Sequence, residues 1–189
     1  MRMLTKAELA AWNAIPTAVL SDERGHRGVL SGLRPLFAER SFAAQAFTIA
    51  VEDEVNGAPR KALTEVWADA CIVIDARLRP DGAVWGGNLA GIARGRGVAA
   101  IVVAGNVRDV ADLRASGLAI YSRGVTPRGP AWGGRIGGDI HCGGVEIASG
   151  DLLVGDEDGL IAVPLADVDD ALLARCHSRL ARETQGRAG

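Results

Sequence analysis

The stretch GGNLAGIARGRGVAAIVVAGNVRD, residues 86–109, decides the fold of this chain. Its glycine-rich turn opens a helix over 88–96 that stops at a glycine, and an apolar strand over 99–104 follows. Arg108 and Asp109 stand just beyond that strand. A turn, a helix and a buried strand in this order predict a βαβ unit with parallel strands.

The rest of the chain continues this alternation. Thr5 and Glu8 form a capping box, which predicts an N-terminal helix reaching about residue 13. We expect further helices over 17–23, 61–67, 110–116 and 166–182, and further strands over 33–37, 43–51, 70–76, 119–122, 144–148 and 160–163. Residues 82–87 and 126–138 are expected to be loops. The later strands are close together in the chain and are expected to be antiparallel, so the sheet is mixed.

Composition limits the class of protein. The 189 residues, 48% of them hydrophobic and 4% aromatic, favour one α/β domain with a core of Ala, Val, Leu and Ile. A net charge of −2 gives little support to a nucleic-acid partner. No apolar segment has the length of a membrane span, and the first residues carry no signal-peptide core, so we expect no membrane partner and a cytoplasmic location. The three widely spaced cysteines, Cys71, Cys142 and Cys176, argue against a disulfide framework.

Polar side chains follow the ends of the predicted strands. Ligands of parallel α/β sheets collect beyond the carboxyl ends of the strands, where Asp75, Asn106, Arg108 and Asp109 fall. The turn at 86–89 offers free backbone N–H groups to an anion. Arg binds carboxylates, and Asp binds Mg²⁺ or Mn²⁺ through oxygen. Together they suggest a metal-assisted site for a small carboxylate, although an ordinary turn and a surface ion pair at a helix start remain the alternatives for each part.

Other familiar catalytic patterns are missing from the sequence. His26, His141 and His177 lack the spacing of a zinc site. His141 and Cys142 are neighbours in a strand and therefore point to opposite faces, which disfavours a nucleophile and base pair. Glu183 near the end of the last helix is expected to be exposed unless another subunit covers it.

Three segments together resemble one known family. GGNLAGIARGRGVAAIVVAGNVRDVADL, then YSRGVTPRGP, then HCGGVEIASGDLLVGDEDGLIAVP resemble the 4-hydroxy-4-methyl-2-oxoglutarate aldolase family, which includes the regulator of ribonuclease activity A. The likeness covers about residues 15–185 and is strongest over 85–164. It implies a fold similar to a phosphohistidine swivelling domain, an α/β/α sandwich with a central mixed sheet. One aldolase-like domain with N- and C-terminal helices would then span residues 1–189.

The resemblance also implies an activity. Family members are divalent-metal-dependent class II pyruvate aldolases that use Mg²⁺ or Mn²⁺ as cofactor. They cleave 4-hydroxy-4-methyl-2-oxoglutarate or 4-carboxy-4-hydroxy-2-oxoadipate to pyruvate, and many decarboxylate oxaloacetate. Family members form homotrimers or homohexamers with sites between subunits. The implied partners of this chain are therefore a small 2-oxo acid and further copies of itself.

The family's site residues map onto this chain by motif. The substrate-binding turn falls on Gly86, Gly87, Asn88 and Leu89. Arg108 corresponds to the substrate ligand and Asp109 to the metal ligand, which makes both catalytic. Glu183 is the nearest match to a catalytic glutamate that reaches a neighbouring subunit's site.

One position departs from the family pattern. Many aldolases carry an acidic residue at the second position of the turn, where this chain has Gly87. Asn88, Asp75 or a residue of a neighbouring subunit are the candidates for compensation. The departure keeps two alternatives open: a related lyase acting on another 2-oxo acid, and a non-catalytic regulator that binds a ribonuclease.

Overall fold

The computed structural model describes residues 2–51, 57–129 and 134–187. Within these ranges the helices are α1 (Lys6–Asn13), α2 (Thr17–Glu23), α3 (Ala58–Glu65), α4 (Gly87–Gly95), α5 (Val110–Ser116), the 3₁₀ helix η1 (Leu165–Asp167) and α6 (Asp170–Arg187). The strands are β1 (Arg34–Pro35), β2 (Phe42–Ala50), β3 (Ala70–Asp75), β4 (Ala83–Trp85), β5 (Ala100–Val107), β6 (Ala119–Val125), β7 (Arg135–Ile136), β8 (Ile140–Cys142), β9 (Val145–Ile147), β10 (Leu152–Gly155) and β11 (Leu160–Val163).

A mixed sheet forms the centre of the molecule. Its strand order in the described residues is β1-β6-β5-β3-β2-β10-β11, with β4 beside β5 and β7 beside β2. Strands β2, β3, β5 and β6 pair in parallel, whereas β10 and β11 pair antiparallel. Every residue of β3 is buried, as expected of a parallel strand covered on both faces. The expected α/β fold with a central mixed sheet is therefore confirmed.

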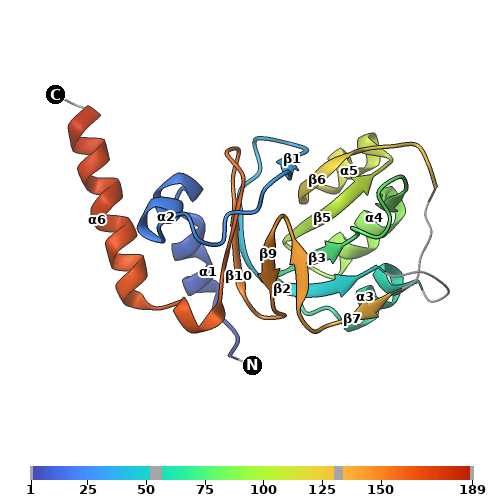
Figure 1. The fold of residues 1–189 in the computed structure, drawn as a ribbon, viewed down its shortest axis with the longest axis horizontal. Helices are drawn as coiled ribbons and strands as arrows, with labels where there is room; N and C mark the ends of the chain where they lie inside the picture. The colour runs from blue at the N-terminus through green and yellow to red at the C-terminus, as the bar shows by residue number, and fades with distance from the viewer. Residues whose placement is uncertain (1, 52–56, 130–133, 188–189) are drawn as a thin grey trace.

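Helices divide into two groups on either side of the view in Figure 1. Helices α3, α4 and α5 cover one face of the parallel strands and share a core with them. The β8–β9 hairpin covers part of the other face. Helices α1, α2 and α6 pack on β10 and β11 at the far end, and we call these five elements the terminal layer.

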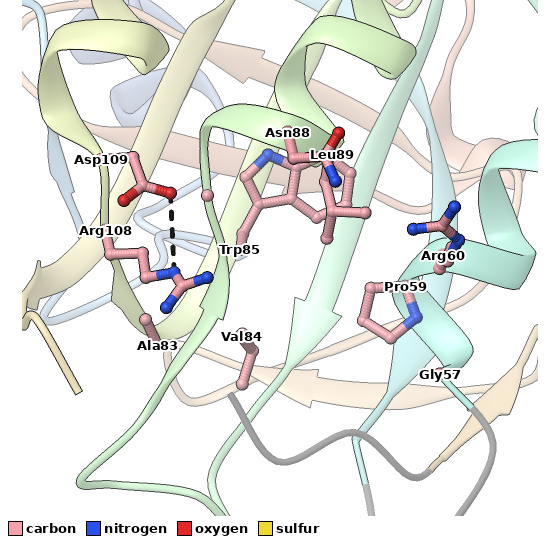
Figure 2. A pocket seen from close by; sticks show the side chains of 11 residues that line it. Gly57, Pro59, Arg60, Ala83, Val84, Trp85, Asn88, Leu89, Arg108 and Asp109 are labelled. Carbon is pink, nitrogen blue, oxygen red and sulfur yellow. Dashed lines mark ion pairs between the residues drawn. The ribbon is translucent and has the colours of Figure 1, made fainter. Parts of the chain in front are cut away.

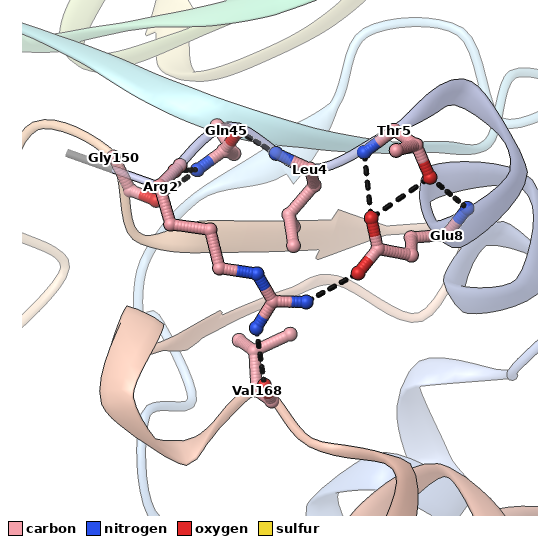
Figure 3. Close-up of polar contacts among 7 residues, drawn as sticks. All are labelled: Arg2, Leu4, Thr5, Glu8, Gln45, Gly150 and Val168. Atoms are coloured by element: carbon pink, nitrogen blue, oxygen red, sulfur yellow. Dashed lines mark hydrogen bonds and ion pairs between the residues drawn. The ribbon is translucent and has the colours of Figure 1, made fainter.

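One buried side chain links the N-terminal segment to the sheet. Gln45 of β2 accepts a hydrogen bond from the Leu4 N–H at 2.7 Å and donates to the Gly150 C=O at 2.8 Å (Figure 3). The predicted capping box of Thr5 and Glu8 is present at the start of α1. These contacts fix where the first helix meets the sheet.

Most predicted elements are confirmed, but the shortest strands were missed. Residues 83–85 form β4 within an expected loop, and β7 lies in the second expected loop, whose residues 130–133 fall outside the described ranges. Strands β8 and β10 were also missed, and α6 begins at Asp170 rather than at 166. Strands this short carry too few residues for a readable alternation and exist only because a longer neighbour pairs with them.

Two further expectations concern the cysteines and the length of apolar helices. Cys71, Cys142 and Cys176 are buried free thiols, and burial raises the pKa of Cys142 to about 12. In the part of the chain that the structure describes, no helix is both long and apolar enough to cross a membrane.

Candidate active site

A pocket opens where β4 and β5 end and α4 begins. Figure 2 shows its walls: Arg108 and Asp109 on one side, the start of α4 behind, and α3 opposite. The lining residues are Gly57, Pro59, Arg60, Ala83, Val84, Trp85, Gly86, Asn88, Leu89, Arg108 and Asp109. The turn at 86–89 and the Arg-Asp pair therefore meet at one cavity, where the Gly87 N–H bonds to Asp109, 22 positions further along the chain.

Asp109 has an unusual backbone that turns its carboxylate away from its own helix. It is the N-cap of α5 but adopts a left-handed conformation (φ 60°, ψ 49°) and makes no capping hydrogen bond. Its Oδ2 instead accepts a hydrogen bond from the Gly87 N–H at 3.2 Å. A non-glycine residue in this region carries a conformational cost, which is common at functional sites. The conformation thus directs the carboxylate to the first turn of α4.

Arg108 is held by its backbone while its side chain stays available. Its N–H donates to the Trp85 C=O at 3.0 Å, which ties the end of β5 to the end of β4. Its Nε lies 3.5 Å from Asp109 Oδ2, and the guanidinium has no other ion pair among the described residues. A half-exposed guanidinium with free terminal nitrogens is suited to gripping a carboxylate with two hydrogen bonds.

The first turn of α4 offers backbone donors to the same cavity. The first intrahelical bond runs from the Ala90 N–H to the Gly86 C=O at 3.0 Å, and no side chain caps the helix. The N–H groups of Asn88 and Leu89 therefore face outward at the positive end of the helix dipole. A Cβ on Gly86 would lie 2.7 Å from Asp109 Oδ2, so glycine is required for this close approach.

Two further lining residues escaped the sequence analysis. Trp85 is 1% exposed, and its indole N–H has no hydrogen-bond partner among the described residues. Arg60 of α3 lines the wall opposite Arg108 (Figure 2) and forms no hydrogen bond or ion pair with the described chain. The expected helix over 61–67 left Arg60 outside, and no local pattern shows that α3 packs beside α4.

Two of the residues expected in the crevice lie elsewhere. Asp75 accepts hydrogen bonds from Arg77, with Nε and Nη2 at 2.9 and 2.8 Å, and does not line the pocket. Asn106 donates to the Pro80 C=O at 2.8 Å. The expectation that both join Arg108 and Asp109 is therefore wrong, because local partners close to each strand end satisfy these side chains. Burial favours a raised pKa for Asp75, but the Arg77 hydrogen bonds outweigh it and lower the pKa.

Glu183 does not reach the pocket of its own chain. It lies near the end of α6, which Figure 1 places on the opposite side of the molecule from α4 and α5. Its Oε1 accepts a hydrogen bond from Arg179 Nε at 3.0 Å. A catalytic role for Glu183 therefore requires a second copy of the chain and stays a prediction.

The donor set of the pocket fits a hard divalent cation. Mg²⁺ and Mn²⁺ prefer oxygen, and Mg²⁺ is commonly held by one or two carboxylates with water filling the other positions. Asp109 supplies a half-exposed carboxylate, and Asn88 supplies an amide oxygen at the start of α4. Within the described ranges no three His, Cys, Asp or Glu residues gather into a metal cluster, and Asp109 is the one acidic side chain among the pocket's described lining residues.

Comparison with known proteins places this geometry in a family. The family model described as aldolase/RraA, or RraA-like, matches residues 17–162. A Halalkalibacterium halodurans protein provisionally named a 4-hydroxy-4-methyl-2-oxoglutarate aldolase is 34% identical over 167 residues, covering 87% of this chain and 80% of that protein.

Two solved structures share the fold. The Streptomyces coelicolor protein RraAS2, titled an unusual member of the RNase ES inhibitor RraA family, has a TM-score of 0.89 at 24% identity over 99% of this chain and 98% of its own. The RNA-processing inhibitor RraA from Thermus thermophilus has a TM-score of 0.70 at 32% identity over 79% of this chain and 92% of its own. The relatives' names thus cover both an aldolase and ribonuclease inhibitors. The match over residues 17–162 shows that this chain belongs to the aldolase/RraA family.

Proposed function

We propose that this protein is a divalent-metal-dependent carbon–carbon lyase, a class II pyruvate aldolase with oxaloacetate decarboxylase activity. The observation that carries the proposal is the left-handed Asp109, whose carboxylate turns from α5 to the α4 amide beside a largely unpaired Arg108. A chain that needed these residues only for a helix start would place Asp109 as an ordinary cap. The family membership and the aldolase-named relative support the same reading.

The reaction would use the pocket as follows. Mg²⁺ or Mn²⁺ bound at Asp109 would supply Lewis acidity toward a 2-oxo acid. Arg108 and the outward N–H groups of Asn88 and Leu89 would bind the substrate carboxylate. When the bond between C3 and C4 breaks, its electron pair moves into the pyruvate enolate, and Arg108 stabilises that negative charge. Preorganised charge of this kind is usually the largest contribution to catalysis.

Arg60 places a positive charge on the pocket wall that faces Arg108. Val84, Pro59 and Leu89 form an apolar middle between Arg108 and Arg60. A substrate carboxylate at each end would satisfy both guanidinium groups, whereas a monocarboxylate would leave Arg60 without a partner. We therefore propose 4-hydroxy-4-methyl-2-oxoglutarate, 4-carboxy-4-hydroxy-2-oxoadipate and oxaloacetate as substrates ahead of simple 2-oxo acids.

The site is proposed to be completed between subunits of a homotrimer or homohexamer. The aldol reaction must remove the proton of the 4-hydroxyl group, and Glu183 of a neighbouring subunit is the proposed carboxylate for that part of the site. Decarboxylation of oxaloacetate needs no such removal. A Glu183→Gln variant should therefore lose more aldolase than decarboxylase activity, and equal retention of both would exclude the role.

The proposal is tested by pyruvate release from oxaloacetate and from the two aldol substrates. We expect release above the rate of the metal alone, abolished by a chelator and restored by Mg²⁺ or Mn²⁺. Asp109→Asn protein under the same metal concentration controls for spontaneous decarboxylation. Equal rates from both proteins on every 2-oxo acid of the panel would overturn the lyase assignment.

The second candidate is a regulator that binds a ribonuclease in the cytoplasm. It is favoured by the titles of the two solved relatives and by Gly87, which removes an acidic residue that many aldolases carry. A chain that binds a ribonuclease and releases no pyruvate with either metal would support it.

A further inference from the structure

An acidic side chain of α5 occupies the space beside Gly87. A Cβ built on Gly87 would lie 2.4 Å from Asp112 Cβ and 2.7 Å from Asp112 Oδ2. The first of these atoms cannot swing aside, because it is attached to the α5 backbone. Any side chain at position 87 would thus collide with Asp112, and the carboxylate of Asp112 stands where such a side chain would begin.

Helix stability alone does not account for this contact. Asp112 lies in the first turn of α5, where an acid favours the helix dipole. That role needs no neighbour from α4, and Gly91 on the same helix has no atom within 4 Å of a built Cβ. Asp112 also forms no hydrogen bond or ion pair within the described chain. Apart from the helix dipole, the described residues therefore give its charge no stabilising partner.

Two carboxylates converge on two consecutive glycines. A Cβ on Gly86 would meet Asp109 Oδ2 at 2.7 Å, and one on Gly87 would meet Asp112 Oδ2 at the same distance. Both acids lie at the start of α5, so their charges add to one region of negative potential, which favours a cation. The pocket also holds the buried indole N–H of Trp85, which has no partner among the described residues and can donate only to an acceptor such as a substrate oxygen.

We infer that Asp112 supplies the second acidic group of the proposed metal site, in place of a side chain at position 87. Asp112 is a positioning residue. Its negative charge would support the binding of the ion at Asp109, and its side chain does not contact the substrate. This inference rests on the metal dependence in the proposed function. It also explains why the chain lacks an acid at position 87, since the group has moved to the facing helix.

Mn²⁺ binding to the full-length protein, measured by isothermal titration calorimetry without substrate, tests this directly. Loss of a group that supports a metal ligand typically weakens affinity by about 10–100-fold, and we expect that range for Asp112→Asn. Asp170→Asn is the matched control, because Asp170 is also an exposed first-turn acid but belongs to α6 in the terminal layer. Its affinity for Mn²⁺ should not change.

A second variant transfers the carboxylate from position 112 to position 87. Gly87→Asp combined with Asp112→Gly places a carboxylate on α4 and removes the Cβ that lies 2.4 Å from the new side chain. We expect Mn²⁺ affinity close to that of the original protein, with lower thermal stability because glycine weakens a helix. Melting curves of all variants show whether each one is folded.

The outcomes separate this inference from the proposed function. Folded Asp112→Asn protein that binds Mn²⁺ like the original, or a loss matched by Asp170→Asn, would overturn the role of Asp112 while leaving pyruvate release intact. Binding that depends on Asp112 without any pyruvate release would overturn the lyase and keep the metal site. Absence of Mn²⁺ binding by the original protein would overturn both.

Discussion

Charged residues differ in their ion pairing between the pocket and the terminal layer. At the edge of the terminal layer, Arg24 is buried against Asp167 of η1 at 3.2 Å, and within the layer Arg179 pairs with Asp22, Glu23 and Glu183. In the pocket, Arg60 has no ion pair among the described residues, and Arg108 has a single one. Buried charges that belong to a fold are normally paired inside it, whereas the unpaired charges of the pocket are available to a ligand.

The two regions also differ in how side chains cap the first turns of their helices. Helix α1 begins with a complete capping box, whereas α5 begins with an Asp that caps nothing. Helix α4 likewise starts on glycines without a side-chain cap. Side-chain capping thus stabilises α1, whereas α4 and α5 lack it beside the pocket. This pattern is expected where a sequence serves binding or catalysis.

The strongest test of this contrast removes one charge from each region. Asp109→Asn keeps a residue that tolerates the left-handed backbone, so its effect reports the lost charge. We expect at least a ~10²–10³-fold loss in kcat for pyruvate release, the range seen when one preorganised group is deleted. Asp167→Asn should keep full activity and lose stability instead. Comparable kcat losses in both variants would break the distinction between the two regions.

The next test concerns the two guanidinium groups of the pocket. Arg60→Ala should lower kcat/KM for a dicarboxylate such as oxaloacetate by about 10–100-fold, since a hydrogen bond to a charged group contributes ~1.5–3 kcal/mol. The same change should leave a monocarboxylate 2-oxo acid unaffected, whereas Arg108→Ala should damage both. Steady-state kinetics on matched substrates gives the answer. Equal losses of kcat/KM for the two substrate classes would show that Arg60 does not bind the distal carboxylate.

A pair of glycines in α4 sharpens the comparison within one helix. Gly87→Ala should destabilise the protein by about 1–3 kcal/mol, because its Cβ would press on Asp112. Gly91→Ala meets nothing within 4 Å and should stabilise it by about 0.5–1 kcal/mol. Urea unfolding of the two variants measures both signs. A stabilising Gly87→Ala would mean that α5 stands further from α4 than described.

The smallest effect is a pH dependence at the end of β3. The pKa of Asp75 is lowered, so its ion pair with Arg77 contributes stability above the pKa of the unfolded chain and loses it as the pH falls through the folded value. We expect Asp75→Asn to cost about 1 kcal/mol at pH 7 and to reduce the stability lost between pH 7 and pH 3. Chemical denaturation at the two pH values checks this. An unchanged acid sensitivity would contradict the assigned cause.

The long elements could be read from the sequence because their patterns are local. The buried run of β3, the glycine after α5 and the capping box of α1 each specify an element within a few residues. Strands β4, β7 and β10 could not be read in this way, since partners far along the chain hold them in the sheet. The same limit applies to the site, where Asp75 and Asn106 looked equivalent to Asp109 until their local partners were known.

The sequence by itself determined the α/β class, the turn at 86–89 and the position of Arg108 and Asp109 between a strand and a helix, because each depends on neighbours within one βαβ unit. Only the tertiary structure decided that Arg60 faces Arg108, that the Trp85 N–H is unpartnered and that Asp112 fills the space at Gly87. These facts depend on how α3 and α5 pack around α4. Packing is set by the whole core, and no short stretch of sequence encodes it.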